Sequence, residues 1–124
     1  VEDIRRACEV QAKSHLIHLR EGFLESHAET TRVGRLIAAS AAPLRALLTN
    51  IARLPAVASA KGALSDDALA KFAEERIHVP AAVIRDVLAT SAHGHSAITD
   101  PTHLLSRYIE AAQRIWEYVD TWHS

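Results

Sequence analysis

The stretch Val33-Gly-Arg-Leu-Ile-Ala-Ala-Ser-Ala-Ala-Pro-Leu-Arg-Ala-Leu-Leu-Thr-Asn-Ile-Ala-Arg-Leu54 decides the fold. Its apolar row advances by alternating steps of four and three, which is typical of a helix buried against other helices. Pro43 does not shift the phase of this row, so we expect one helix, kinked where the carbonyl of Ala39 loses its partner. Ser40 is close enough to bond back to a carbonyl of the preceding turn. The row consists of Val33, Ile37, Ser40, Leu44, Leu47, Ile51 and Leu54.

Two more long helices are predicted, one on each side of this stretch in the sequence. The first runs from about Asp3 to His27, and Thr30 or Thr31 is expected to cap the central helix that follows. The last begins at Asp100 and Pro101, a cap followed by a first-turn proline. Both carry apolar residues at helical spacing. These are Ile4, Cys8, Ala12, Leu16, Leu19 and Phe23 in the first helix, and Leu105, Tyr108, Ala112, Ile115, Val119 and Trp122 in the last.

A pair of short helices is predicted between the central and last helices. Ser65 caps a helix that extends to Arg76, and Pro80 opens a second one. Residues 56–64 and 91–99 are expected to be loops. The pair has the outline of a helix-turn-helix, but one basic residue in the second helix does not supply the phosphate contacts that DNA binding needs. We therefore predict an all-α fold, an up-and-down bundle of three long helices plus a short helix pair.

Length and composition predict one domain over residues 1–124. The single cysteine, Cys8, excludes an internal disulfide and favours a reducing cytoplasm. No stretch resembles a membrane span. The net charge is −1 and both signs are interleaved, which argues against a nucleic-acid-binding face. Because the sequence contains no methionine, we expect a C-terminal piece of a longer polypeptide.

No motif for group transfer is present in the sequence. It has no glycine-rich phosphate loop, no Gly-x-Ser-x-Gly and no Cys-x-x-Cys, so we expect neither catalysis nor a cofactor from this chain.

The histidines suggest two possible metal sites. His15 and His18 lie one turn apart, but Cys8 is about 10 Å from His15 along a helix and is too far to share a metal with it. His93, His95 and His103 lie near one helix start and also fit an ordinary polar loop beside a helix cap. We expect no metal, and a stand-alone metal-binding or signalling bundle stays open as an alternative.

Arginines supply the candidate ligand contacts. Arg20 and His27 are seven residues apart, as in the arginine and histidine motif of HEPN ribonuclease bundles, where the histidine acts as acid or base. Glu21 after the arginine departs from that pattern, and a HEPN-like ribonuclease using Arg20 and His27 stays open as an alternative function. A row on the central helix is expected to point away from the core, and Arg35 and Arg53 are its candidates for ligand contact. The whole row is Arg32, Arg35, Arg45 and Arg53.

The Val33 to Leu54 stretch resembles the helical region that follows the catalytic domain in bacterial proteins of the polymerase β-like nucleotidyltransferase superfamily. The segments His15-Leu-Ile-His-Leu-Arg-Glu-Gly-Phe23 and Leu105-Ser-Arg-Tyr-Ile-Glu-Ala-Ala-Gln-Arg-Ile-Trp-Glu-Tyr-Val-Asp120 occur in the same order in that group. The resemblance implies a noncatalytic accessory domain that binds a nucleotide, another small-molecule substrate or a partner for a nucleotidyltransferase catalytic domain in the same or another chain. A homodimer is also compatible with it.

Overall fold

A computed structural model describes residues 2–54, 64–94 and 98–122. These residues form helices and connecting turns, with no strand among them, so the predicted all-α class is confirmed. The loop predicted for residues 56–64 lies almost wholly outside the described ranges. The segments are α1 (Glu2–Ser26), α2 (Thr30–Ala52), α3 (Asp66–Phe72), the π-helical turn η1 (Ala73–Ile77), α4 (Ala81–His93) and α5 (Pro101–Thr121).

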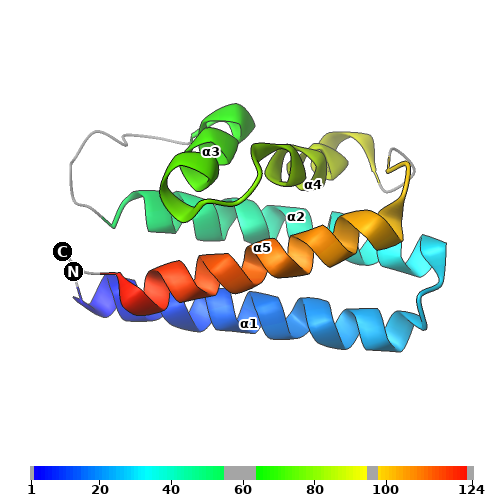
Figure 1. Ribbon diagram of the computed structural model, residues 1–124, viewed down its shortest axis with the longest axis horizontal. Coiled ribbons are helices and arrows are strands. Elements are labelled where there is room, and N and C mark those ends of the chain that lie inside the picture. Colours follow the sequence, from blue (N-terminus) through cyan, green and yellow to red (C-terminus); the bar gives the residue numbers. More distant parts are fainter. Residues whose placement is uncertain (1, 55–63, 95–97, 123–124) are drawn as a thin grey trace.

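The helices pack in layers around α2 (Figure 1). α1 lies along α5 and also contacts α2. α4 packs on the other side of α2, with α3 beside it. The start of α1 and the end of α5 lie at the same end of the molecule. Among the described helices, only α2 and α5 pack against α1, and its outward side has no described helix against it.

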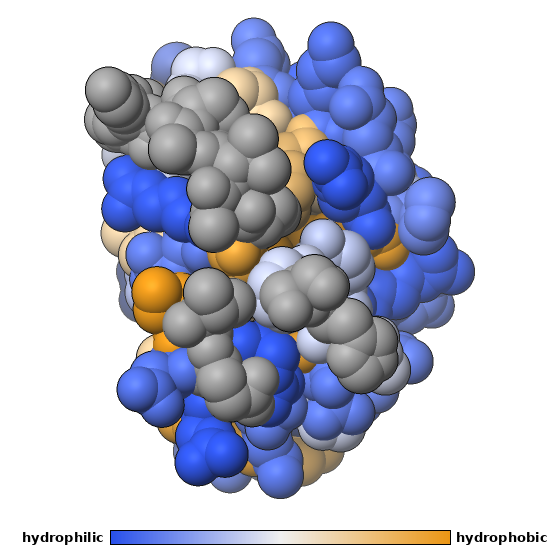
Figure 2. Space-filling model, turned by 90° about the vertical axis from the view of Figure 1, so that its left-hand side faces the viewer, coloured by the Kyte–Doolittle hydropathy of each residue, from blue (hydrophilic) through white to orange (hydrophobic). Residues whose placement is uncertain are grey.

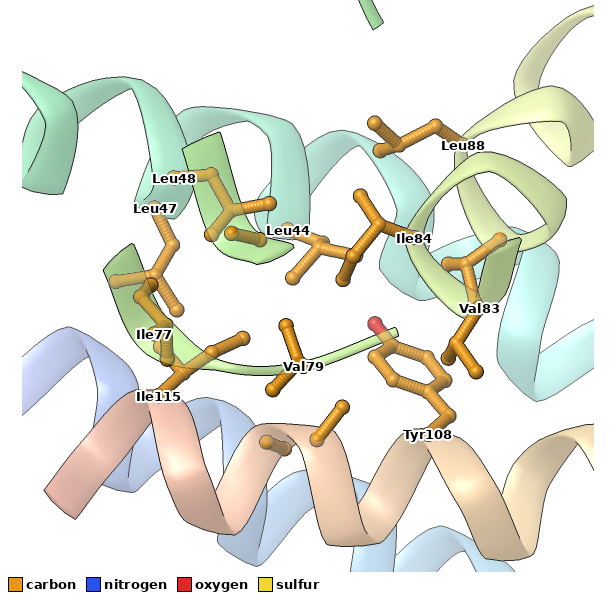
Figure 3. Close-up of a cluster of buried hydrophobic side chains, with 14 of the residues drawn as sticks. Leu44, Leu47, Leu48, Ile77, Val79, Val83, Ile84, Leu88, Tyr108 and Ile115 are labelled. Carbon is orange, nitrogen blue, oxygen red and sulfur yellow. The ribbon is translucent and has the colours of Figure 1, made fainter. Parts of the chain in front are cut away.

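The predicted row on α2 forms the centre of the core. Its apolar members are fully buried, and α2 continues through Pro43 as one helix. Figure 3 shows Leu44 and Leu47 of this row facing Ile84 of α4 and Ile115 of α5. Ser40 Oγ donates to the carbonyl oxygen of Ile37 at 2.8 Å, as expected from its position. The helix assignment from spacing is confirmed.

The turn between α1 and α2 differs from the prediction. α1 ends at Ser26 instead of His27, because His27 and Ala28 adopt left-handed backbone angles, with φ of 52° and 60°. The cap of α2 is Glu29, not Thr30 or Thr31. Its carboxylate accepts from the backbone N–H groups of the first turn, and these bonds lower the pKa of Glu29.

The first short helix and the last long helix begin at their predicted caps, but the two short helices end elsewhere than predicted. Ser65 Oγ accepts from the Ala68 N–H, and Asp100 Oδ1 accepts from the His103 N–H, which confirms both caps. The first short helix does not stay regular to Arg76, because it widens into the π turn at Ala73. α4 continues to His93, so a loop from residue 91 is wrong.

Arg45 does not project freely into solvent as predicted. Its guanidinium binds Asp66 through two contacts, with Nε 2.9 Å from Oδ1 and Nη2 3.2 Å from Oδ2. It also reaches the Leu88 carbonyl and the Ser91 hydroxyl on α4. The arginine therefore joins α2 to the short helix pair, a contact between distant segments that helical spacing does not reveal.

Candidate functional site: the groove between α1 and α2

The four arginine and histidine candidates do not converge on one site. Arg20 Nη2 donates to Gln113 Oε1 on α5 at 2.8 Å. Arg35 and Arg53 are 18 residues apart on α2 and its cap, which corresponds to about 27 Å along a helix. His27 lies in the turn beyond α1, so it does not share a helix with Arg20 as the ribonuclease pattern requires.

The histidines on α1 have different surroundings. His15 is buried, whereas His18 is exposed. Cys8 is a buried free thiol whose pKa is raised by burial. Within the described ranges, no group of three or more metal-ligating side chains is placed to hold an ion. His95 of the second predicted histidine cluster lies outside those ranges.

His15 is the first member of a buried polar chain that links three helices. Its Nε2 lies 2.7 Å from the hydroxyl of Tyr108 on α5, and that hydroxyl lies 2.8 Å from Ser40 Oγ on α2. Ser40 is also bonded to the Ile37 carbonyl oxygen. Figure 3 shows the Tyr108 hydroxyl pointing into the core. Sequence reasoning identified each residue separately but not their contact.

Counting protons assigns a direction to each bond. The Ser40 hydroxyl donates to Ile37, so Tyr108 must donate to Ser40, and the Nε2–H of a neutral His15 must donate to Tyr108. Burial, with a smaller contribution from His18, lowers the pKa of His15 to about 4. Burial also raises the pKa of Tyr108. The side chains of His15, Tyr108 and Ser40 are therefore uncharged at physiological pH, and their polar atoms bond to one another.

A groove of about 430 Å³ lies above this polar chain, between α1 and α2. His15 and Ser40 contribute to its floor, while the exposed residues Val10 and Pro43 lie on opposite sides. Because the polar floor is already hydrogen-bonded within the protein, the groove presents mainly small and apolar surface. Its lining is Ala7, Val10, Gln11, Ser14, His15, His18, Ala39, Ser40 and Pro43.

The outward side of α1 carries a second apolar row next to this groove. Val10, Ile17 and Leu24 are seven residues apart and are 65%, 43% and 73% exposed. Ile4, which was predicted to be in the core, is also exposed at 55%. Figure 2, which views the end of the molecule where α1 begins, shows orange hydrophobic atoms at several places on a mostly blue surface. We call Val10, Ile17 and Leu24 the outer row.

Basic side chains border the outer row. Arg6, Lys13 and Arg20 are exposed, and each lies four residues before a member of the outer row. Residues four apart are neighbours on a helix surface, so these cations form a parallel line, which we call the basic row. Glu9, the acid within this stretch, is paired with Arg5 at 3.0 Å. The heptad spacing of both rows is visible in the sequence, but the core stripe on the opposite face obscured it.

The surface hollows along α5 differ in character. One of about 280 Å³ has Asp86, Asp100 and Arg107 in its lining. A neighbouring one of about 460 Å³ has Glu74, Glu110 and Arg114. Both signs of charge alternate there, and Arg114 already donates to the His78 carbonyl at 2.7 Å. The groove between α1 and α2 is therefore the better candidate for a binding site.

In comparisons with protein-family models, curated proteins and solved structures, nothing matched this chain. In the part of the chain that the structure describes, no helix combines the length and apolar character needed to cross a bilayer.

Proposed function

We propose that this chain is a noncatalytic helical domain that binds a partner protein, or another part of its own protein, through the groove between α1 and α2. The carrying observation is the outer row together with the groove beside it, because exposed apolar side chains that border a hollow are typical of surfaces that another element covers. In this proposal the three long helices form an up-and-down frame, bent at Pro43, that presents the groove.

The polar chain favours a protein partner over a small polar substrate. His15, Tyr108 and Ser40 bond to one another and to the backbone. Specific small-molecule sites place a few polar groups so that they face the ligand. Beside the groove the exposed outer row is instead apolar, and burying it gains free energy without a polar ligand.

The resemblance to polymerase β-like nucleotidyltransferases supplies the class of partner. We propose that a catalytic domain of that kind, in the same or another chain, uses this domain as its accessory. The same proposal includes a cytoplasmic location for the protein. It also places the chemical reaction in the catalytic domain and not in this chain. Reading the gene upstream of Val1 and its neighbouring genes tests the class, since an unrelated domain there would reject it.

Co-purification tests the surface. The catalytic domain found in this way should be retained by the wild-type chain and lost with Ile17→Asp, which places a charge at the centre of the outer row. Glu110→Arg, on the hollow along α5, is the control and should retain binding. Retention by Ile17→Asp together with loss by Glu110→Arg would place the partner on α5 and reject the groove.

A further inference from the structure

The basic row gives the proposed binding surface a preferred sign of charge. Arg6 and Lys13 are exposed on α1 beside Val10 and Ile17. Glu9, the acidic residue between them in the sequence, is held by Arg5, and the exposed Glu21 lies further along α1, after Lys13. An occupant of the outer row therefore meets cations along one edge.

The shape of this surface suits a helix. Val10 and Leu24, the ends of the outer row, are 14 residues apart, about 21 Å along α1 at 1.5 Å per residue, and the groove lies alongside the first half of the row. The far wall of the groove is made by Ala39 and Pro43. Small residues on α2 allow close approach, and a helix laid between α1 and α2 would cover both the groove and the outer row.

We propose that the occupant is an amphipathic helix of a partner protein whose apolar face is bordered by glutamate or aspartate at heptad spacing. The apolar face covers Val10 and Ile17, and the acidic border pairs with Arg6 and Lys13. Charges at the edge of an interface contribute mainly to partner choice and association rate. This inference rests on the proposed function and names the chemistry of its partner.

Antiparallel pairing with a second copy of the chain fits this surface less well. Antiparallel pairing of two α1 helices through their outer rows would set basic row against basic row, which is unfavourable. An anionic membrane also attracts basic amphipathic helices, and it is one of the outcomes that the test separates.

Two synthetic peptides of about three heptads provide the probe. Both carry leucine at positions a and d, and they differ in having glutamate or lysine at e and g. Fluorescence anisotropy of each labelled peptide is measured against rising concentrations of the full chain. We expect saturable binding of the glutamate peptide, weakened by salt, and at least about tenfold weaker binding of the lysine peptide.

Variants connect the charge preference to α1. Lys13→Glu should weaken binding of the glutamate peptide about fivefold or more and narrow the difference between the peptides. Arg107→Glu makes the same charge change on the distant α5 surface and should leave both affinities unchanged. Circular dichroism of each variant establishes that it is folded.

The outcomes separate the inference from the proposed function. Equal binding of the two peptides, both lost in Ile17→Asp, would overturn the acidic preference and keep the groove. If neither peptide binds, or if Ile17→Asp does not reduce their binding, both the acidic preference and the proposed binding groove would be overturned. Binding to vesicles of phosphatidylglycerol without binding to the glutamate peptide, or self-association that Ile17→Asp abolishes, would also overturn the inference.

Discussion

The two faces of α1 are both apolar at helical spacing, yet they have opposite surroundings. On the inner face, Leu16 and Leu19 are buried against α2 and α5. On the outer face, Ile17 and Leu24 are exposed. Periodicity therefore shows that a face is apolar but not what covers it. The inner face stabilises the fold, and we propose that the outer face binds a partner.

Shortening a leucine on each face should give the largest difference. Leu19→Ala removes a fully buried side chain and should cost about 3 to 4 kcal/mol of unfolding free energy, since it leaves a cavity. Leu24→Ala, at 73% exposure, should change it by less than about 0.5 kcal/mol. Urea unfolding measures both, and equal losses would show that the outer face is also part of the core.

Low pH should destabilise the fold through His15, the buried histidine on the inner face of α1. The pKa of His15 is lowered by burial to about 4, so between about pH 6.5 and 4 the unfolded chain binds more protons than the folded one. Stability is fully present above this window and falls by about 3 kcal/mol as pH drops through it. His15→Leu should flatten this slope, and His18→Gln should retain most of it. A slope unchanged in His15→Leu would contradict the assignment.

Two buried polar groups, one hydrogen-bonded and one without a partner in the described structure, should contribute differently to stability. Tyr108→Phe removes the hydroxyl shared by His15 and Ser40 and should cost about 1 to 2 kcal/mol. The indole N–H of Trp116 is buried with no partner in the described structure, so replacing the ring with phenylalanine loses no hydrogen bond. Thermal unfolding should show a loss of stability in Tyr108→Phe that comes from the lost hydrogen bonds, whereas any loss in Trp116→Phe comes from the smaller ring. A Tyr108→Phe variant as stable as wild type would show that the hydrogen bonds of the Tyr108 hydroxyl contribute nothing to stability.

The smallest effect on stability is expected at the outer edge. Lys13→Glu changes an exposed side chain and should alter the unfolding free energy by less than about 0.5 kcal/mol. The same change should weaken binding of the glutamate peptide. A large loss of stability would mean that Lys13 supports the fold and would remove it from the binding surface.

Much of the fold follows from local sequence signals. The buried row of α2 and the caps at Ser65 and Asp100 each depend on spacing or on a side chain next to its own helix. Arg45 was misplaced because its partner, Asp66, is brought to it by tertiary packing. Glu29 displaced two threonines as a cap because its longer carboxylate reaches the N–H groups from outside the turn.

The candidate site was harder to predict than the fold. His15 and Ser40 were singled out, but Tyr108 joins them only because α5 lies against both α1 and α2. Ile4 was assigned to the core because it continues the inner stripe in phase, although the packing of α1 leaves its side chain exposed. The outer row was missed because the longer core stripe on the opposite face of α1 obscured its heptad spacing.

The most direct test of the division between the two faces is a nitrogen–proton NMR titration of the chain with the glutamate peptide. The account predicts shifts confined to amides along the groove, including Ala7, Val10 and Ala39, while those of Arg107 and Glu110 on α5 stay in place. Shifts centred on the α5 hollows, or none at a peptide concentration that saturates the anisotropy signal, would contradict it.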